Sequence, residues 1–393
     1  MDETRAAELV EFCQRLVRTK SYSGQEQDAA SVLADEMRAL GYDEVIVDRY
    51  GSVIGTIEGN RPGPTVLFDG HIDTVPAENA EKWTYPPFEA RIADGRIYGR
   101  GTSDMKGADA AFTKAVAWFA ADRNRDFAGR ICVAGVVQEE CFEGVASRSV
   151  SKICKPDYVI IGESSLCNLK VGQRGRAEIK IETRGVPAHS ANPEKGVNAV
   201  YKMCGVIDAV RRIVPGEHPV LGRGILELVD IKSEPYPGAS VVPEFCSATY
   251  DRRLLVGETP ESVLASVQSV LANLVAKDDE LQVNAHFTEA EDVCYTGERI
   301  AAERFFPGWL FDADADWIQT IKAKLEEKGF SPEITQYNFC TNGSHYAGEA
   351  GIRTIGLGPS REDLAHTVDE YIEISELTKV AGCYYAVLEA LLA

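Results

Sequence analysis

Residues 131–140 read Ile-Cys-Val-Ala-Gly-Val-Val-Gln-Glu-Glu, an apolar run that ends in two adjacent acids. A short apolar run without polar alternation is typical of a strand that is buried on both faces of a sheet. Glu139 and Glu140 lie at the end of this strand, where two neighbouring carboxylates repel each other and are costly to remove from water. The pair therefore requires positive charge nearby, and a metal ion is the form of charge that the rest of the sequence indicates.

The segments that flank this strand alternate between helix and strand patterns. Apolar runs at 65–68 and 158–161 predict two more buried strands, and the Ala-rich residues 106–121 predict a helix. This alternation favours an α/β domain with a mostly parallel mixed sheet flanked by helices. The other elements expected in this domain are helices at 5–18, 25–41, 312–328 and 375–392, a hairpin at 44–58 and a strand at 352–357.

The middle of the chain follows a different pattern. Residues 177–183 alternate strictly between apolar and polar side chains, as expected of a strand with one solvated face. The elements expected after this strand are a helix at 196–213, strands at 224–231 and 245–251, a helix at 259–275 and a strand at 281–287. Their β-α-β-β-α-β order predicts a ferredoxin-like α+β domain. We therefore expect an inserted domain at 176–289 within a larger domain made of residues 1–175 and 290–393.

The composition of the chain indicates which kinds of partner the protein binds and in which compartment it works. The 393 residues carry a formal net charge of −20, which leaves no excess of cations for nucleic-acid phosphates or an anionic membrane. No run approaches the roughly 20 apolar residues that span a bilayer, and the N-terminal residues lack the basic and apolar regions of a secretory signal. The ten cysteines contain no C-x-x-C pair, which is typical of reduced thiols in a cytoplasmic protein.

Other acids and histidines follow the expected strands. His71 and Asp73 come after the first buried strand and, two residues apart on extended chain, they point the same way. Glu163 follows a later strand, Asp104 ends a glycine-rich loop in front of a helix, and His366 lies in a loop near the C-terminus. Each of them alone is also consistent with an ordinary role, because Asp is a common helix N-cap residue and a single histidine is often a surface residue.

Together these residues predict a two-metal centre. Ligands collect at the carboxyl ends of the strands of parallel sheets. Oxygen and imidazole ligands suit Zn²⁺ and tolerate Mn²⁺ or Co²⁺. Two histidines and three carboxylates are too many for one tetrahedral catalytic zinc, but they suit two ions that share a bridging carboxylate and activate a water between them. One acid of the pair at 139–140 is left to act as base, because neighbours on extended chain point apart.

The motifs that carry this ligand set resemble those of a known enzyme family. Residues 68–76 read Phe-Asp-Gly-His-Ile-Asp-Thr-Val-Pro, and residues 98–107 read Tyr-Gly-Arg-Gly-Thr-Ser-Asp-Met-Lys-Gly. Both are similar to motifs of the family of acetylornithine deacetylase, succinyl-diaminopimelate desuccinylase, aminoacylase and bacterial carboxypeptidase G, which are two-metal peptidases and deacylases. The resemblance covers essentially the whole chain, including the inserted domain.

The resemblance implies a role for each residue of the centre. His71 and Glu163 would hold one metal ion, Glu140 and His366 would hold the other, and Asp104 would bridge the two. The expected cofactor is therefore two divalent ions per subunit, with zinc first and cobalt or manganese as alternatives.

The resemblance also implies a mechanism for amide hydrolysis. Asp73 would orient His71, and the peptide bond after Asp104 is often cis in this family. Glu139 would be the general base, which deprotonates the water between the ions and later gives the proton to the leaving amine.

The inserted domain of the family acts as a lid and mediates dimerisation, so the resemblance implies a homodimer formed through residues 176–289. The loop at 185–190 resembles the family's histidine loop, in which the histidine, here His189, reaches a neighbouring active site and polarises the scissile carbonyl. On the residues alone, a turn histidine in front of the helix at 196–213 is the favoured interpretation of His189, and the resemblance reverses this preference. Arg253 lies in an Asp-x-Arg segment similar to that of the family, and its guanidinium would bind a substrate carboxylate.

One segment departs from the family. Many relatives carry Gly-Thr-Asp near the substrate, and His345 stands here where those relatives have the acid. The residues expected to contact the substrate in this segment are Asn342, Gly343, Ser344 and His345. The predicted substrate is an N-acyl amino acid or a small peptide, cleaved by a deacylase or exopeptidase. A carbamoyl or ureido amidohydrolase is the alternative, and a non-catalytic binding protein on the same scaffold is disfavoured by the intact Glu139 and ligand set.

Overall fold

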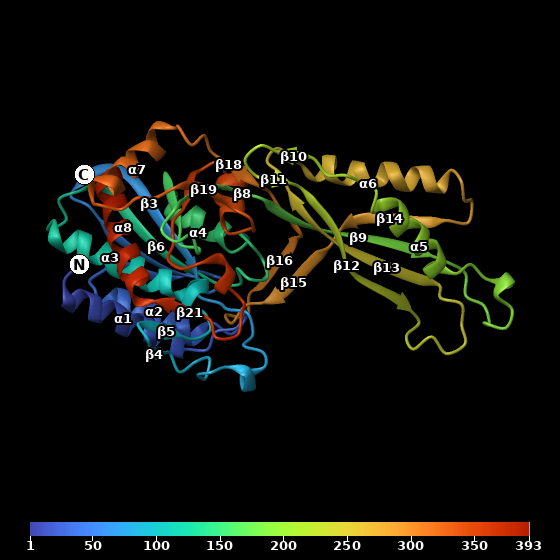
Figure 1. Cartoon of the computed structure of the whole chain (residues 1–393), viewed down its shortest axis with the longest axis horizontal. Helices are drawn as coiled ribbons and strands as arrows, with labels where there is room; N and C mark the ends of the chain where they lie inside the picture. Colours follow the sequence, from blue (N-terminus) through green and yellow to red (C-terminus); the bar gives the residue numbers. More distant parts are fainter. Residues whose placement is uncertain (393) are drawn as a thin grey trace. The chain divides into compact units, whose positions relative to one another are not determined.

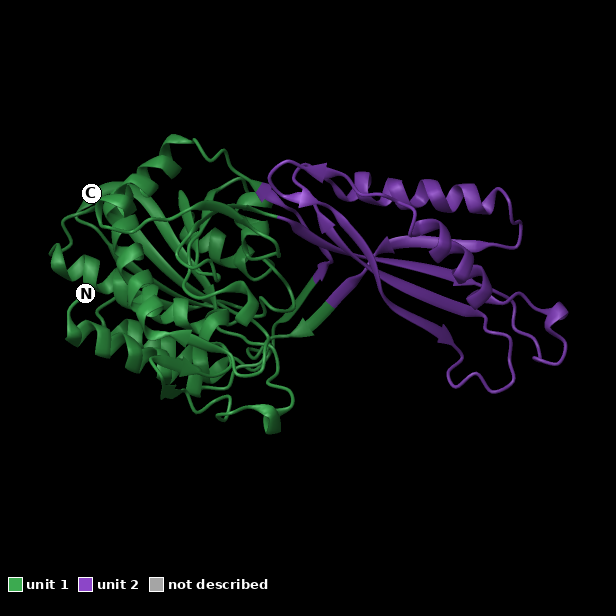
Figure 2. Ribbon diagram, in the orientation of Figure 1, with its two compact units in different colours: residues 1–173, 291–301, 310–393 green, residues 174–290, 302–309 purple. Residues whose placement is uncertain are grey.

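The computed structural model describes residues 1–392, which form two compact units (Figure 2). Unit 1 comprises Met1–Gln173, Glu291–Ala301 and the residues from Leu310 onward, and unit 2 comprises Arg174–Ala290 and Ala302–Trp309. The segment 302–309 lies outside the predicted insert, yet it belongs to unit 2. Its strand β17 (Phe305–Phe306) pairs with β9 (Gly175–Arg184) of that unit. A strand of two residues is too short to be predicted from the sequence.

Unit 1 is built on the mostly parallel mixed sheet that the sequence predicts. Its strands are β1 Glu44–Val47, β2 Val53–Glu58, β3 Arg61–His71, β6 Ala128–Val136, β7 Tyr158–Ile161, β8 Leu169–Gln173, β19 Ile334–Tyr337 and β20 Arg353–Gly356. They run in the order β1-β2-β6-β3-β7-β20-β8, followed by the two-residue β18 (Trp309–Leu310), and β19 also pairs with β8. Figure 1 shows the neighbouring strands β3 and β6 side by side. The central pairs, β6 with β3, β3 with β7 and β7 with β20, are parallel, so their carboxyl ends meet at one edge.

Helices flank this sheet. Their bounds are α1 Glu3–Arg18, α2 Gln27–Ala39, α3 Gly107–Asp122, α4 Ser147–Cys154, α7 Asp316–Glu327 and α8 Ile374–Leu392. A Cβ on Gly70 of β3 would lie 2.9 Å from Phe112 of α3, and a Cβ on Gly135 of β6 would lie 2.3 Å from Leu33 of α2. Asp69, one residue earlier on β3, points to the opposite face. The glycines therefore let α2 and α3 approach one face of the sheet closely.

A small second sheet of unit 1 joins two distant parts of the chain. It contains β4 (Arg91–Ala93), β5 (Arg96–Tyr98) and β21 (Tyr371–Glu373), in the order β21-β5-β4. Strands of three residues are too short to show a hydrophobic period, and the sequence did not predict them. Across residues 1–392, no helix is both long and apolar enough to cross a membrane.

Unit 2 has the predicted ferredoxin-like fold. The elements after β9 are α5 Ala199–Val210, β12 Ile225–Glu234, β13 Phe245–Leu254, α6 Pro260–Val275 and β14 Gln282–Phe287. The sheet is antiparallel in the order β12-β13-β9-β14. Alternate residues of β9, Ala177, Ile179 and Ile181, are buried in a core with apolar residues of α5 and α6, which explains the strict alternation in the sequence. β10 (Glu217–His218) and β11 (Gly222–Arg223) form a separate two-stranded sheet of this unit. β15 (Glu289–Val293) and β16 (Arg299–Glu303) form another, and the residues of both strands are divided between the two units.

Candidate metal centre

The parallel strands of unit 1 bring the predicted acids and one histidine to the same edge of the sheet. His71 is the last residue of β3, Glu139 and Glu140 follow β6, and Glu163 follows β7. Because these three strands are parallel neighbours, their carboxyl ends lie side by side, which is where ligands of α/β sheets collect. The side chains of His71, Glu139 and Glu163 are at most 7% exposed.

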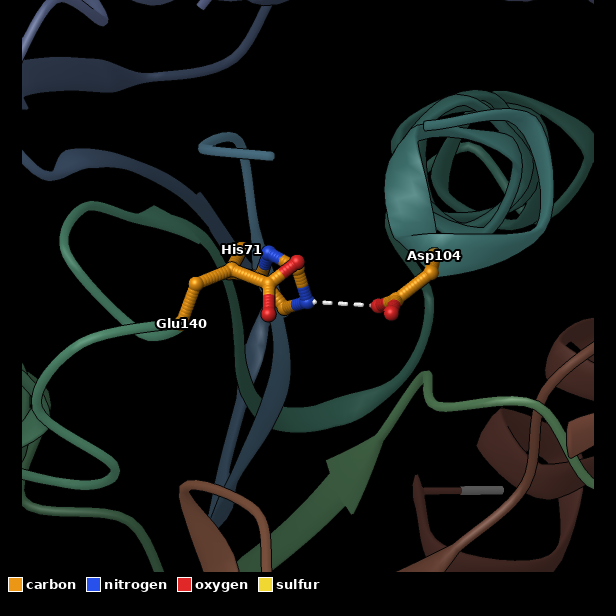
Figure 3. A group of neighbouring side chains, drawn as sticks. All are labelled: His71, Asp104 and Glu140. Carbon is orange, nitrogen blue, oxygen red and sulfur yellow. Dashed lines mark hydrogen bonds and ion pairs between the residues drawn. The ribbon is translucent and has the colours of Figure 1, made fainter. Parts of the chain in front are cut away.

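Asp104 lies between the two histidines. Its Oδ1 is 2.9 Å from Nε2 of His71, and its Oδ2 is 3.1 Å from Nε2 of His366. Figure 3 shows the side chains of His71 and Asp104 pointing towards each other, with Asp104 in front of α3. The Asp104–Met105 peptide bond is cis, as the resemblance implies. The two oxygens of one carboxylate therefore face two imidazoles, which is the arrangement that a bridging ligand requires.

Two glutamates complete the surroundings of the histidines. Glu140 Oε2 lies 3.0 Å from Nε2 of His366, and Glu163 Oε1 lies 3.5 Å from Nε2 of His71. Glu139 Oε2 is farther from His71 Nε2, at 3.9 Å, and Glu139 Oε1 has no hydrogen-bond partner among the described residues. His366 has a φ of +61° and its side chain is 53% exposed, so it closes the group from the solvent side.

The donor atoms fit divalent cations. One ligand atom each from His71, Asp104 and Glu140 lie within 4.8 Å of one another, and the same holds for His71, Glu139 and Glu163. All of these atoms are imidazole nitrogens or carboxylate oxygens, the ligands of zinc, manganese and cobalt. Acceptor atoms at such distances repel each other unless protons or cations lie between them, so the packing itself favours bound cations.

The side chains of the centre carry more negative than positive charge when no metal ion is bound. Burial raises the pKa of Glu139 well above its ordinary value and raises the pKa of Glu140 to about 7. Hydrogen bonds to Asp104 and Glu140 raise the pKa of His366 to about 10. Burial alone would raise the pKa of Asp104, but the hydrogen bonds with His366 and His71 outweigh it and hold that pKa below its ordinary value. Two cations would relieve the carboxylate repulsion that the histidines only partly offset.

Asp73 does more than its sequence position suggests. Its backbone carbonyl, 2.9 Å away, accepts a hydrogen bond from Nδ1 of His71, whereas its carboxylate lies 3.6 Å from that atom. The Nδ1 contact leaves Nε2 of His71 directed at the acids. The carboxylate itself accepts the backbone N–H groups of Glu139 at 3.0 Å and Glu140 at 3.2 Å, and the Ser23 hydroxyl at 2.7 Å. Asp73 thus ties the end of β3 to the glutamate pair, a contact that depends on strand neighbours and leaves no signal in sequence.

Two of the residues predicted to contact substrate have side chains bonded within unit 1. Nδ2 of Asn342 donates to Asp69 Oδ1 at 2.9 Å, and its Oδ1 accepts the backbone N–H of Gly144 at 2.9 Å. The hydroxyl of Ser344 lies 3.1 Å from the Gln173 amide nitrogen, which donates to it. Asn342 therefore ties the loop after Glu140 to the strand that carries His71.

The neighbouring residues of this segment form a second polar group. His345 Nδ1 lies 2.8 Å from Glu349 Oε2, and Arg148 donates to the same carboxylate at 2.5 and 3.0 Å. The backbone N–H of Gly343 donates to the Thr341 hydroxyl at 3.0 Å. The position at which the resemblance leads us to expect an acid thus holds a histidine that is itself paired with an acid four residues later. Sequence reasoning missed both Glu349 and the buried Asp69.

His189 and Arg253 belong to unit 2. His189 is exposed, and its Nδ1 accepts a hydrogen bond from the backbone N–H of Ala191 at 3.0 Å. Arg253 is half-buried on β13, where its Nε lies 2.8 Å from Asp251 Oδ1. Neither residue is among those that the structure brings together in unit 1.

The chain has relatives of known family. Residues 67–390 match the sequence profile of Peptidase family M20/M25/M40. The uncharacterized protein YgeY of Escherichia coli strain K12 is 31% identical over 386 residues, which cover 97% of this chain and 94% of YgeY. A succinyl-diaminopimelate desuccinylase of Hydrogenovibrio crunogenus is 29% identical over 396 residues, which cover 96% of this chain and 97% of that enzyme.

Solved structures share the fold. The aminopeptidase PepT from Bacillus cereus has a TM-score of 0.76 at 21% identity, with 98% of each chain covered. YXEP from Bacillus subtilis, described as a dinuclear metal-binding peptidase of the M20 family, has a TM-score of 0.71 at 12% identity, with 99% of each chain covered.

Proposed function

The chain belongs to Peptidase family M20/M25/M40, and from this premise we propose that it is a two-metal hydrolase of amide bonds in N-acyl amino acids or small peptides. The observation that carries the proposal is the position of Asp104, whose two oxygens face Nε2 of His71 and Nε2 of His366. A carboxylate shared by two imidazoles is expected of a two-ion site and not of a single zinc site.

The ligand roles follow from the contacts. His71 and Glu163 would hold one ion, His366 and Glu140 the other, and Asp104 both. When bound, the ions would supply Lewis acidity that makes a water acidic and polarises the scissile carbonyl. Zinc is our first choice because nitrogen and oxygen donors suit it, with manganese or cobalt as alternatives.

Glu139 is the proposed general base. It is 6% exposed, one of its carboxylate oxygens has no hydrogen-bond partner among the described residues, and burial raises its pKa well above the ordinary value. Such a carboxylate can take a proton from the attacking water as the carbon–oxygen bond forms. The same proton then passes to the amide nitrogen as the carbon–nitrogen bond breaks, which gives a carboxylic acid and an amine. The remaining proton of the acid then passes to the amine, so a carboxylate and an ammonium group leave. Its distance of 3.9 Å from His71 Nε2, the longest in the group, favours this role over metal ligation.

Unit 2 would complete the reaction. Because Nδ1 of His189 accepts a hydrogen bond, the neutral ring carries its proton on Nε2 and could donate it to the oxygen of the scissile carbonyl. Arg253 would bind a substrate carboxylate through its guanidinium. We also propose that unit 2 mediates a homodimer and that the protein works in the cytoplasm. The ten cysteines, all free thiols, are consistent with that compartment.

The names of the relatives suggest which acyl group the enzyme removes. The relative from Hydrogenovibrio crunogenus is named a desuccinylase, which places N-succinyl amino acids among the first substrates to test. We propose that residues 342–345 form the segment that faces the substrate. His345, paired with Glu349, places an imidazole in this segment, and hydrolysis of carbamoyl or ureido amides is the second candidate.

Free-amine release from N-acetyl, N-succinyl and N-carbamoyl amino acids and dipeptides tests the proposal. The purified protein is loaded with Zn²⁺, Mn²⁺ or Co²⁺, and a chelator-treated sample is the control. Cleavage of one class that the chelator abolishes supports the proposal and names the substrate class. Cleavage that persists at full rate in the metal-free protein, or none by protein with two bound ions, contradicts it.

A further inference from the structure

We propose that Glu370 is a positioning residue of the metal centre, which holds the turn that carries Asp104 against the C-terminal segment that carries His366. This inference rests on the proposed two-metal function. Glu370 is fully buried and lies directly before β21, four residues after His366.

The carboxylate of Glu370 is saturated by contacts to the loop in front of Asp104. Oε1 accepts the backbone N–H of Ser103 at 2.8 Å and that of Asp104 at 3.2 Å. Oε2 accepts a hydrogen bond from Nη1 of Arg100 at 2.6 Å, and Arg100 is only 4% exposed. The backbone carbonyl of Glu370 also accepts the N–H of Gly99 at 2.9 Å. One residue from the C-terminal segment thus fixes the loop from residue 99 to residue 104.

The turn cannot hold these N–H groups by itself. Asp104 has φ −130° and ψ 92°, and Met105 has φ −136° and ψ 27°, so the chain is not helical there. α3 begins only at Gly107, and these non-helical angles interrupt the helical hydrogen-bond pattern in front of it, so the N–H groups of Ser103 and Asp104 take an acceptor from another segment. Buried N–H groups need a partner. The carboxylate of Glu370 is that partner, supplied by a segment more than 260 residues away along the chain.

The same residue fixes the other side of the Asp104–His366 contact. β21, which starts directly after Glu370, pairs with β5, which ends directly before Gly99. Asp369 connects the same C-terminal segment to residue 84, because its Oδ1 accepts a hydrogen bond from the backbone N–H of Thr84 at 2.7 Å. Only three residues separate His366 from Glu370 along the chain. The 3.1 Å distance from His366 Nε2 to Asp104 Oδ2 is therefore set by how Glu370 joins the two segments.

The test is a titration of metal-free protein with Co²⁺, followed by visible absorption, which reports both affinity and coordination. Glu370→Gln keeps one acceptor oxygen but turns an amide group towards Arg100 or towards the loop N–H groups, and Glu370→Ala removes every contact. The matched control is Glu373→Gln, three residues later at the end of β21, because Glu373 pairs with the half-exposed Arg96 at 2.8 Å and does not touch the loop. Thermal unfolding of each metal-free protein is measured alongside.

We expect Glu370→Gln to weaken cobalt binding about 10- to 100-fold and to change the absorption band, since loss of a residue that orients a ligand has effects of this size. Glu370→Ala should lose at least as much, and Glu373→Gln should stay within about twofold of wild type. A folded Glu370→Gln protein with wild-type affinity and spectrum overturns the inference, even if its unfolding temperature falls, because that result describes a structural role only. Equal losses in the Glu373→Gln control overturn it as well. If Glu370→Ala does not fold, Glu370→Gln decides alone. Wild-type protein that fails to bind two cobalt ions overturns the proposed function itself, so the two failures are distinguishable.

Discussion

Replacing Asp73 with asparagine tests whether its carboxylate positions Glu139 and Glu140, because both glutamate side chains stay unchanged in this variant. The carboxylate of Asp73 accepts the backbone N–H groups of Glu139 and Glu140 through different oxygens. Asparagine offers a single acceptor oxygen, so in either orientation of its amide one of these N–H groups faces an NH₂ group. The side chain of Asp73 is fully buried, so water cannot replace the lost partner.

The magnitude follows from these contacts. Losing a hydrogen bond to a charged acceptor and leaving a buried donor unpaired costs about 1.5–3 kcal/mol. At 1.36 kcal/mol per factor of ten, this free energy corresponds to a combined loss of about 10- to 150-fold in kcat and metal affinity. The loss in kcat arises because the base Glu139 is displaced, and the loss in metal affinity arises because the ligand Glu140 is displaced.

The assay measures kcat with saturating metal and the affinity of metal-free protein for Co²⁺. Ser23→Ala is the matched control, because it removes the hydroxyl that also donates to Asp73 and leaves both backbone hydrogen bonds in place. We expect that control to change either quantity by less than about threefold, because both backbone N–H groups keep their carboxylate acceptor. An Asp73→Asn protein that stays within this range in both quantities would refute the reasoning, since the carboxylate would then be dispensable for positioning.

Three further predictions rest on other parts of unit 1. Glu139→Gln should keep both metal ions, measured by metal analysis, while kcat falls about 10²- to 10⁴-fold because the base is lost; nearly normal turnover would disprove its role. Gly70→Ala should destabilise the protein by about 1–3 kcal/mol in denaturant unfolding, because the new Cβ would lie 2.4 Å from a side-chain oxygen of α3; an unchanged midpoint would contradict this packing. Burial raises the pKa of Glu349, but hydrogen bonds from His345 and Arg148 outweigh it and lower the pKa from 4.5 to about 2. The unfolded chain therefore binds the proton more readily, so this stabilisation is complete above pH 4.5 and is lost as the pH falls towards 2; Glu349→Gln should flatten that part of the stability–pH curve, and a curve identical to wild type would count against the ion pair.

Much of the fold could be predicted because its elements are long and regular. The alternation in residues 177–183 became the central strand β9 of unit 2, and the apolar run before Glu139 became the central strand β6 of unit 1. Elements with no clear period escaped prediction. The helix α4 has eight residues, and β5 and β21 have three residues each, too few to show a hydrophobic face. The pairing of β17 with β9 also could not be foreseen, since two residues carry no pattern.

The sequence by itself determined which chemical groups the centre has, because local motifs encode them. A buried strand followed by acids, and a glycine-rich loop that ends in Asp104, already indicate ligands and their order along the chain. Only the tertiary structure decided how those groups are held. The carboxylates of Asp73 and Glu370 bond to backbone N–H groups of segments far away in sequence. Backbone N–H groups are the same in every residue except proline, so their partners are selected by strand order and register. That selection exists only once the chain has folded.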